Sequence, residues 1–98
     1  MNQYMVDITL PEYLSEEFVS LIPFQRSQVN RLMGRGILNS YSLSMDRGKI
    51  WTVVNADTQK EAEKTIGSFP LVKFMRYEIH ELAFNNNIAQ ILPRFSLN

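Results

Sequence analysis

The sequence contains no cysteine, one histidine, one tryptophan, and four residues each of glycine and proline. Without cysteine there can be no disulfide, thiolate metal site or thiol nucleophile, and such a chain fits the cytoplasm. The lone His80 excludes a metal site built from several histidines, and no acidic residues show metal-ligand spacing. We therefore expect a cytoplasmic protein that uses no metal.

The chain also lacks a net charge and a long apolar run. Ten Lys and Arg residues balance ten Asp and Glu residues, so no strong field would attract nucleic acid or an anionic membrane surface. No segment approaches the ~20 apolar residues of a membrane span, and the first residues show no secretory signal. We expect neither nucleic acid nor a membrane as a partner.

The residues that are present suffice for one small domain. The chain has 98 residues, of which 45% are hydrophobic, a composition typical of a globular domain rather than a disordered chain. We assign residues 1–84 to this domain. Residues 85–98 form a tail whose apolar side chains, including Ile91, Leu92 and Phe95, predict docking on the same or a neighbouring subunit.

Hydrophobic periodicity predicts the order strand, helix, strand, strand, helix, strand. Alternating apolar and polar residues mark strands, and apolar residues at helical spacing mark the first helix. The predicted strands are 4–10, 37–45, 49–55 and 73–84; the first helix follows Ser15 and closes at Gly34 and Gly36, and the second begins at Asp57 or Thr58 and stops at Gly67. This is the split βαβ pattern, which predicts an α+β, ferredoxin-like βαββαβ fold.

Three local features carry specific expectations. Pro23 removes a helical hydrogen bond, so we expect a kink there or a short turn before the main helix. Gln25 is the polar exception in the apolar stripe of the first helix. Between the second and third strands, Asp46-Arg47-Gly48 predicts a hairpin turn in which Gly48 supplies the positive φ.

The sheet of such a fold has one face covered by helices, and its other face looks too apolar to remain in water. Trp51 and Val53 point away from the face of Ile50 and Val54. In the last strand, Phe74, Leu82 and Phe84 oppose Met75, Tyr77 and Ile79. We therefore predict that a second copy covers this face and forms a homodimer. The alternative is a monomer whose tail folds across the face.

Three segments resemble the muconolactone delta-isomerase family: Leu10-Pro11, Arg35-Gly36 and, above all, Ser68-Phe69-Pro70-Leu71-Val72-Lys73-Phe74-Met75. The resemblance covers roughly residues 4–84. It implies a dimeric α/β barrel that is often assembled into larger rings. It also implies proton transfer on a small unsaturated lactone, without a metal or an organic cofactor.

The most suggestive polar row lies on the last strand, where Arg76, Glu78 and His80 are two residues apart and leave one face together. A histidine beside a carboxylate can transfer protons near neutral pH, and an arginine can hold a substrate carboxylate. We predict these three residues as catalytic, with Asp7 and Ser42 in contact with the substrate. The alternative is a cross-strand charge pair at a subunit contact or on a hydrated edge.

Tyr41 and Trp51 are predicted to contact the substrate by lining an apolar pocket; the alternative is that both belong to the core. The favoured function is a small-molecule-binding homodimer that acts as a cofactor-independent isomerase. Two alternatives stay open: a non-catalytic assembly or ligand-sensing domain, and an oxygen-using monooxygenase on the same barrel. The first is motivated by residues 25–28 and 41–44, which lack the family's carboxylates and its cation.

Overall fold

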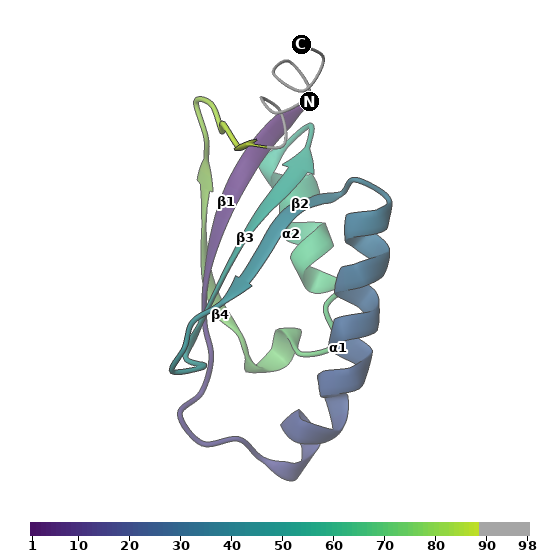
Figure 1. Ribbon diagram of the computed structural model, residues 1–98, viewed down its shortest axis with the longest axis vertical. Helices are drawn as coiled ribbons and strands as arrows, with labels where there is room; N and C mark the ends of the chain where they lie inside the picture. Colours follow the sequence, from purple (N-terminus) through teal and green to yellow (C-terminus); the bar gives the residue numbers. More distant parts are fainter. Residues whose placement is uncertain (89–98) are drawn as a thin grey trace.

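The computed structural model describes residues 1–88 and has the order of elements predicted from the sequence. The elements are β1 (Asn2–Thr9), α1 (Glu16–Gly34), β2 (Leu38–Leu43), β3 (Lys49–Ala56), α2 (Gln59–Gly67), the 3₁₀ turn η1 (Val72–Phe74) and β4 (Arg76–Glu81) (Figure 1). Within the described part of the chain, neither α-helix combines the length and hydropathy needed to cross a bilayer.

The four strands form one antiparallel sheet in the order β2-β3-β1-β4, and both helices lie against the same face of it (Figure 1). This α+β arrangement is compatible with the predicted ferredoxin-like topology. We call the side without helices the open face. In the tail assigned to residues 85–98, Asn85 bonds back to Asn39 of the same chain, with Nδ2 3.3 Å from Oδ1; residues 89–98 lie outside the described residues.

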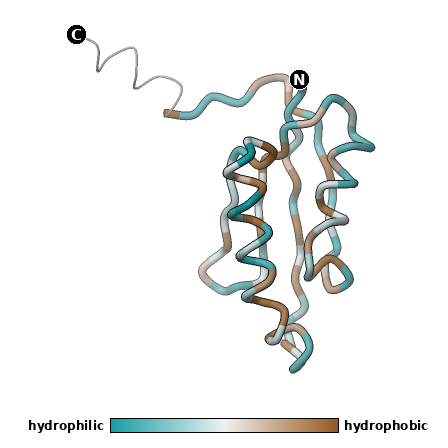
Figure 2. The backbone as a smooth tube through the Cα atoms, turned by 90° about the vertical axis from the view of Figure 1, so that its right-hand side faces the viewer, coloured by the Kyte–Doolittle hydropathy of each residue, from teal (hydrophilic) through white to brown (hydrophobic). Residues whose placement is uncertain are grey.

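The hydrophobic core lies between the helices and the sheet. In β1 the alternation is complete, because Tyr4, Val6 and Ile8 are buried while the residues between them remain partly exposed. Along α1, hydrophobic and hydrophilic positions alternate at helical spacing (Figure 2), and Phe18 and Leu32 are among the residues that α1 buries. The strand period of two and the helix period of 3.6 therefore place apolar side chains in one shared layer.

The ends of α1 are fixed by the residues that the sequence indicated. Ser15 accepts a hydrogen bond from the backbone N–H of Phe18 at 3.1 Å, the usual role of an N-cap serine. At the other end, the N–H of Ile37 bonds to the carbonyl of Leu32 at 2.9 Å, and Gly36 has φ of 73°. This is the Schellman arrangement, in which glycine takes the left-handed position.

Pro23 lies inside α1, which continues through it as one helix. A separate short turn before the main helix, one of the two expected forms, is therefore not found. Phe18 and Gln25 are both buried against the core on either side of Pro23. These anchors hold both halves of the helix on the sheet although one backbone hydrogen bond is missing.

The turn between β2 and β3 differs from the prediction. Arg47, not Gly48, has the positive φ, at 64°. Asp46 Oδ1 accepts hydrogen bonds from the Ser44 hydroxyl at 2.7 Å and from the Gly48 N–H at 2.9 Å. Both bonds favour the ionised carboxylate, so the Ser44 bond first and the Gly48 bond second hold the pKa of Asp46 below its usual range. The Asp46 side chain thus shapes the turn and leaves Arg47 in the left-handed region.

The last strand is shorter than predicted. β4 begins at Arg76, and residues 72–74 form a 3₁₀ turn instead of a strand. The turn brings Phe74 onto the helix side, where its ring meets that of Phe18 edge to face, with centroids 5.3 Å apart. Phe74 is therefore not on the open face, and that face is less apolar than the sequence suggested.

Candidate functional site

The strand register places the predicted catalytic residues together on the open face. Arg76 and Glu78 lie opposite Thr9 and Asp7 of β1, and His80 lies opposite Met5. Paired residues of an antiparallel sheet share a face. Asp7 therefore joins the same polar row, while the residues between them in β4 point toward the helices.

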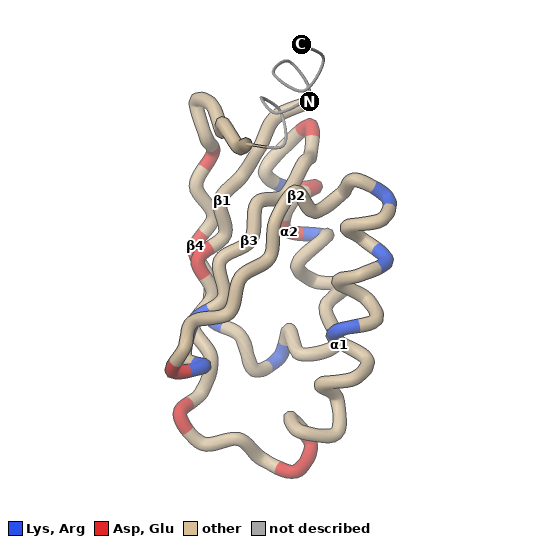
Figure 3. Tube along the Cα trace, in the orientation of Figure 1, with Lys and Arg blue, Asp and Glu red and all other residues tan. Residues whose placement is uncertain are grey.

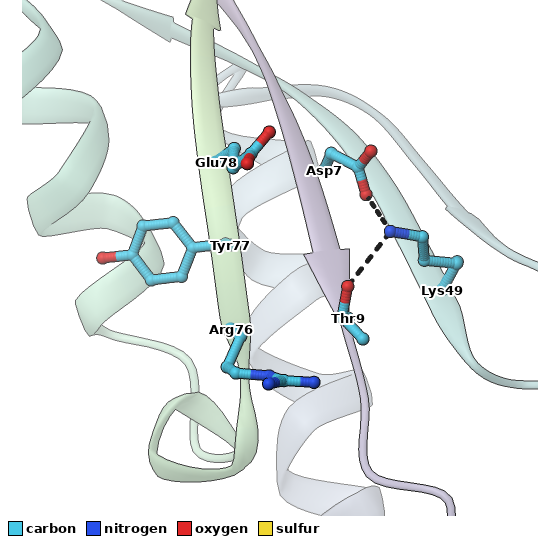
Figure 4. Close-up of a pocket in the computed structure, with 6 residues that line it drawn as sticks. All are labelled: Asp7, Thr9, Lys49, Arg76, Tyr77 and Glu78. Atoms are coloured by element: carbon cyan, nitrogen blue, oxygen red, sulfur yellow. Dashed lines mark hydrogen bonds and ion pairs between the residues drawn. The ribbon is translucent and has the colours of Figure 1, made fainter.

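A shallow cleft of about 360 Å³ lies over this row, which we call the charged cleft. It is lined by Asp7, Thr9, Lys49, Arg76, Tyr77 and Glu78 (Figure 4). Lys49 Nζ donates to Asp7 Oδ1 at 2.8 Å and to Thr9 Oγ1 at 3.0 Å. In Figure 4 the Arg76 side chain extends from β4 toward β1. The cleft therefore presents two cations and two carboxylates side by side.

His80 and Glu78 form a loose pair next to this cleft. His80 Nε2 lies 3.6 Å from Glu78 Oε2, and their side chains are 60% and 79% exposed. At this distance a small movement makes a direct hydrogen bond, so the carboxylate can orient the imidazole. The arrangement can accept or deliver a proton at the open face. Among the described residues, no group of three or more His, Cys, Asp or Glu could hold a metal ion.

The centre of the open face is apolar. Trp51 of β3 lies between Asp7 of β1 and Ser42 of β2, so both predicted substrate contacts flank the ring. Trp51 is 40% exposed, and Val53, also on this face, is only 3% exposed. Of the seven predicted site residues, six therefore meet on one face.

Tyr41 is the exception. It pairs with Thr52 of β3, whereas Ser42 pairs with Trp51, so Tyr41 points to the helix side. The expectation that Tyr41 and Trp51 line one pocket is wrong, because their positions have opposite parity in the β2–β3 ladder. The Tyr41 ring packs edge to face on Phe69, with centroids 6.2 Å apart.

Tyr41 belongs instead to a pocket of about 180 Å³ between α1 and the sheet, the α1 pocket. Its lining residues are Leu10, Leu14, Phe18, Ile22, Gln25, Arg26, Tyr41, Leu43, Arg47, Ile50 and Leu71. Gln25 Nε2 donates to the Tyr41 hydroxyl at 3.2 Å, and Gln25 Oε1 accepts from the Leu71 N–H at 3.1 Å. Burial raises the pKa of Tyr41, and the Gln25 hydrogen bond partly opposes this.

The sequence reasoning missed Lys49 and the site role of Gln25 for different reasons. Lys49 reaches Asp7 only through the pairing of β1 with β3, which no local pattern shows. Gln25 carried a signal, because a polar residue in an apolar helical stripe needs buried partners. Both residues define the candidate sites as firmly as the predicted ones.

The sequence matches no protein-family model, and no curated protein sequence matches it significantly. The resemblance to muconolactone delta-isomerases therefore stays a prediction. Fold and site together define a small α+β domain with a charged cleft on one face of its sheet and an apolar pocket under the other.

Proposed function

We propose that this chain is a small-molecule-binding domain that works as a homodimer through the open face of its sheet. The observation that carries the proposal is the partly exposed Trp51 at the centre of that face, beside the charged cleft. Large aromatic side chains ringed by polar groups are typical of the centres of protein interfaces. Covering Trp51 and Met5 with a second copy would bury apolar surface at about 25 cal/mol per Å².

The charges around Trp51 support association with an identical chain. Lys49 and Arg76 stand beside Asp7 and Glu78 on one face, so the patch contains both signs in equal number. A twofold axis brings the same patch onto itself in the opposite direction. Cations of one copy can then face carboxylates of the other, which favours this register over unrelated ones. The proposal extends to larger rings built from such dimers, as found in the isomerase family that the sequence resembles.

Once a second copy covers the charged cleft, the chemistry that the cleft would support is isomerisation by proton transfer. Arg76 would hold a carboxylate or carbonyl oxygen of an unsaturated substrate. His80, oriented by Glu78, would take a proton from the carbon beside the carbonyl and return it at the far end of the shifted double bond. No atoms are gained or lost and nothing is oxidised, so the step needs no cofactor.

The test is turnover of a β,γ-unsaturated five-membered lactone, with or without a carboxylate, to its conjugated isomer, followed by ultraviolet absorbance. His80→Gln should lower the rate about 100-fold or more, and Glu78→Gln should also lower it. Glu81→Gln is the matched control, because Glu81 lies on the same strand but pairs with Tyr4 of the helix-covered face. Equal rates for His80→Gln and the unchanged protein would show that His80 and Glu78 are not catalytic.

A non-catalytic assembly or ligand-sensing role is the second candidate. It is favoured by the exposure of His80 and Glu78, which lie at the surface of the single chain. In that case the lactones are not converted, while the dimer still forms and binds a ligand. A cytoplasmic location, which the cysteine-free composition fits, is part of the proposal in both cases.

A further inference from the structure

The α1 pocket differs chemically from the charged cleft. Apolar side chains form most of its wall, among them Phe18 and Ile22 of α1, Ile50 of β3 and Leu71. None of the described residues that line it is acidic. A pocket with an apolar wall and a few polar groups is the usual form of a small-molecule site.

Inside this wall, the Tyr41 hydroxyl is a polar group with unused hydrogen-bonding capacity. Its oxygen accepts from Gln25 Nε2, so that bond does not use the hydroxyl proton. The hydroxyl keeps its proton at neutral pH, since even the ordinary tyrosine pKa of 10.0 lies well above 7 and burial raises it further. Tyr41 therefore remains a donor for an oxygen atom that enters the pocket.

Two arginines lie at the edge of the pocket. Arg26 comes from α1 and Arg47 from the turn between β2 and β3, and both are exposed. Neither forms an ion pair with any residue of the described part of the chain. Arg47 also holds a left-handed backbone, a strained conformation that is often found at functional sites. The lining thus carries two positive charges and no negative one.

Charge along α1 is uneven. Its first turn carries Glu16 and Glu17, and the basic residues lie further along the helix (Figure 3). The positive charge at the pocket therefore comes from Arg26 and Arg47 themselves. The volume of about 180 Å³ equals that of about six water molecules in the liquid. It suits one aromatic ring or a short aliphatic chain rather than a large cofactor.

We propose that the α1 pocket binds a small apolar carboxylic acid. The hydrocarbon or aromatic body packs between Phe18, Ile22 and Leu71, and the carboxylate is neutralised by Arg26 and Arg47. Arginine suits this task because its planar guanidinium meets a carboxylate with two parallel hydrogen bonds. This site is separate from the charged cleft, so it survives if the open face proves to have no catalytic or dimer role.

The direct test is titration of the ¹⁵N-labelled full-length chain with benzoate and, separately, with benzamide. The two probes share a ring and differ in charge. Benzoate should give saturable amide shifts at Ile22, Leu43 and Leu71, and benzamide should bind at least tenfold more weakly. Shifts from benzoate centred on Asp7 and Arg76 would place the anion site in the charged cleft and overturn the proposal. Lack of saturable benzoate binding would also overturn it.

A set of variants separates the arginines from the general charge of the chain. The double variant Arg26→Gln/Arg47→Gln should weaken benzoate binding at least fivefold and leave benzamide binding unchanged. Arg31→Gln is the matched control, because Arg31 is an exposed arginine of α1 that does not line the pocket. All three positions are exposed, so the spectra should show intact folds. An equal loss of benzoate affinity in Arg31→Gln would contradict the assignment.

Discussion

Gln25 ties three segments together through one buried side-chain amide. It lies in α1, donates to Tyr41 of β2 and accepts from the backbone of Leu71, in the segment that leads to η1. At 4% exposure it has no access to alternative water partners. A buried polar residue is tolerated when its donors and acceptors are paired, and here both ends of the amide are.

Replacing Gln25 by Met should therefore lower the free energy of unfolding by about 1–3 kcal/mol, because the Leu71 N–H would stay buried without an acceptor. Urea denaturation measures the loss. Gln28→Met on the same helix is the control: Gln28 bonds to Ser68 at the surface, so its change should stay within about 0.5 kcal/mol. Equal losses in the two variants would show that Gln25 has no special role.

Tyr41 should make stability depend on pH in the alkaline range. Its pKa is raised in the folded protein above the ordinary value of 10.0. Between the unfolded and folded pKa values the folded state keeps a proton that the unfolded chain has lost, so the free energy of unfolding falls as pH rises. Below the unfolded pKa this contribution to the pH dependence vanishes.

The measurement is urea denaturation at a series of pH values above neutrality. Tyr41→Phe should flatten the decline above about pH 10, whatever it does to stability at pH 7. Tyr13→Phe is the control, because Tyr13 is 83% exposed, and it should leave the slope unchanged. A slope that Tyr41→Phe does not alter would mean that another group titrates.

Single residues differ in how far the sequence could predict them. Ser15 and Gly36 follow from local rules, because a cap needs only its own turn of helix. Lys49 could not be assigned, since its bond to Asp7 crosses 42 positions of sequence. The positive φ of the turn was predicted at Gly48 and is found at Arg47, because glycine is the usual residue there while the Asp46 side chain decides the conformation here.

Among the elements, the C-terminal end of α1 gives the sharpest prediction. Gly36 has φ of 73° and Gly34 is helical, and a Cβ would meet open space at both. Gly36→Ala should cost about 1–2 kcal/mol, because an L-residue is disfavoured in the left-handed region. Gly34→Ala should be neutral or stabilise by up to about 1 kcal/mol, because alanine favours helix.

Thermal or urea denaturation of the two variants checks this, with each serving as the other's control. The same methyl group is added two residues apart, so differences in hydrophobicity cancel. We expect the changes in the free energy of unfolding to have opposite signs in the two variants, or at least the loss to be clearly larger for Gly36→Ala. Equal effects would contradict the Schellman end of the helix.

Element boundaries were predicted where local patterns suffice and missed where tertiary packing decides. Alternation seemed to run from Lys73 through Phe84, yet the chain tightens into η1 so that Phe74 can reach Phe18. The prediction that Arg76, Glu78 and His80 share one face was still correct, because the shorter strand keeps these alternate positions on the same side. The order of strands and helices needed only periodicity, and it is confirmed.

At the scale of the whole molecule, a substitution on the open face tests whether this face forms the proposed dimer. Trp51→Lys should weaken self-association at least about 30-fold, the equivalent of a central aromatic residue worth about 2 kcal/mol. Phe24→Lys is the matched control, because Phe24 is an exposed aromatic residue of α1, 64% accessible and on the opposite side of the sheet. Sedimentation velocity over a range of concentrations reports both. Loss of the dimer in Phe24→Lys alone would show that the interface lies on the helix side and not on the open face.

The sequence overestimated how apolar the open face is, because Phe74 turns inward and the ends of the strands carry charge. What holds the proposed dimer together is thus a smaller apolar centre within a ring of both charges. Sedimentation equilibrium of the full chain at micromolar concentration tests this most directly. We predict a mass about twice the 11.4 kDa of one chain; a single-chain mass at every concentration would contradict it.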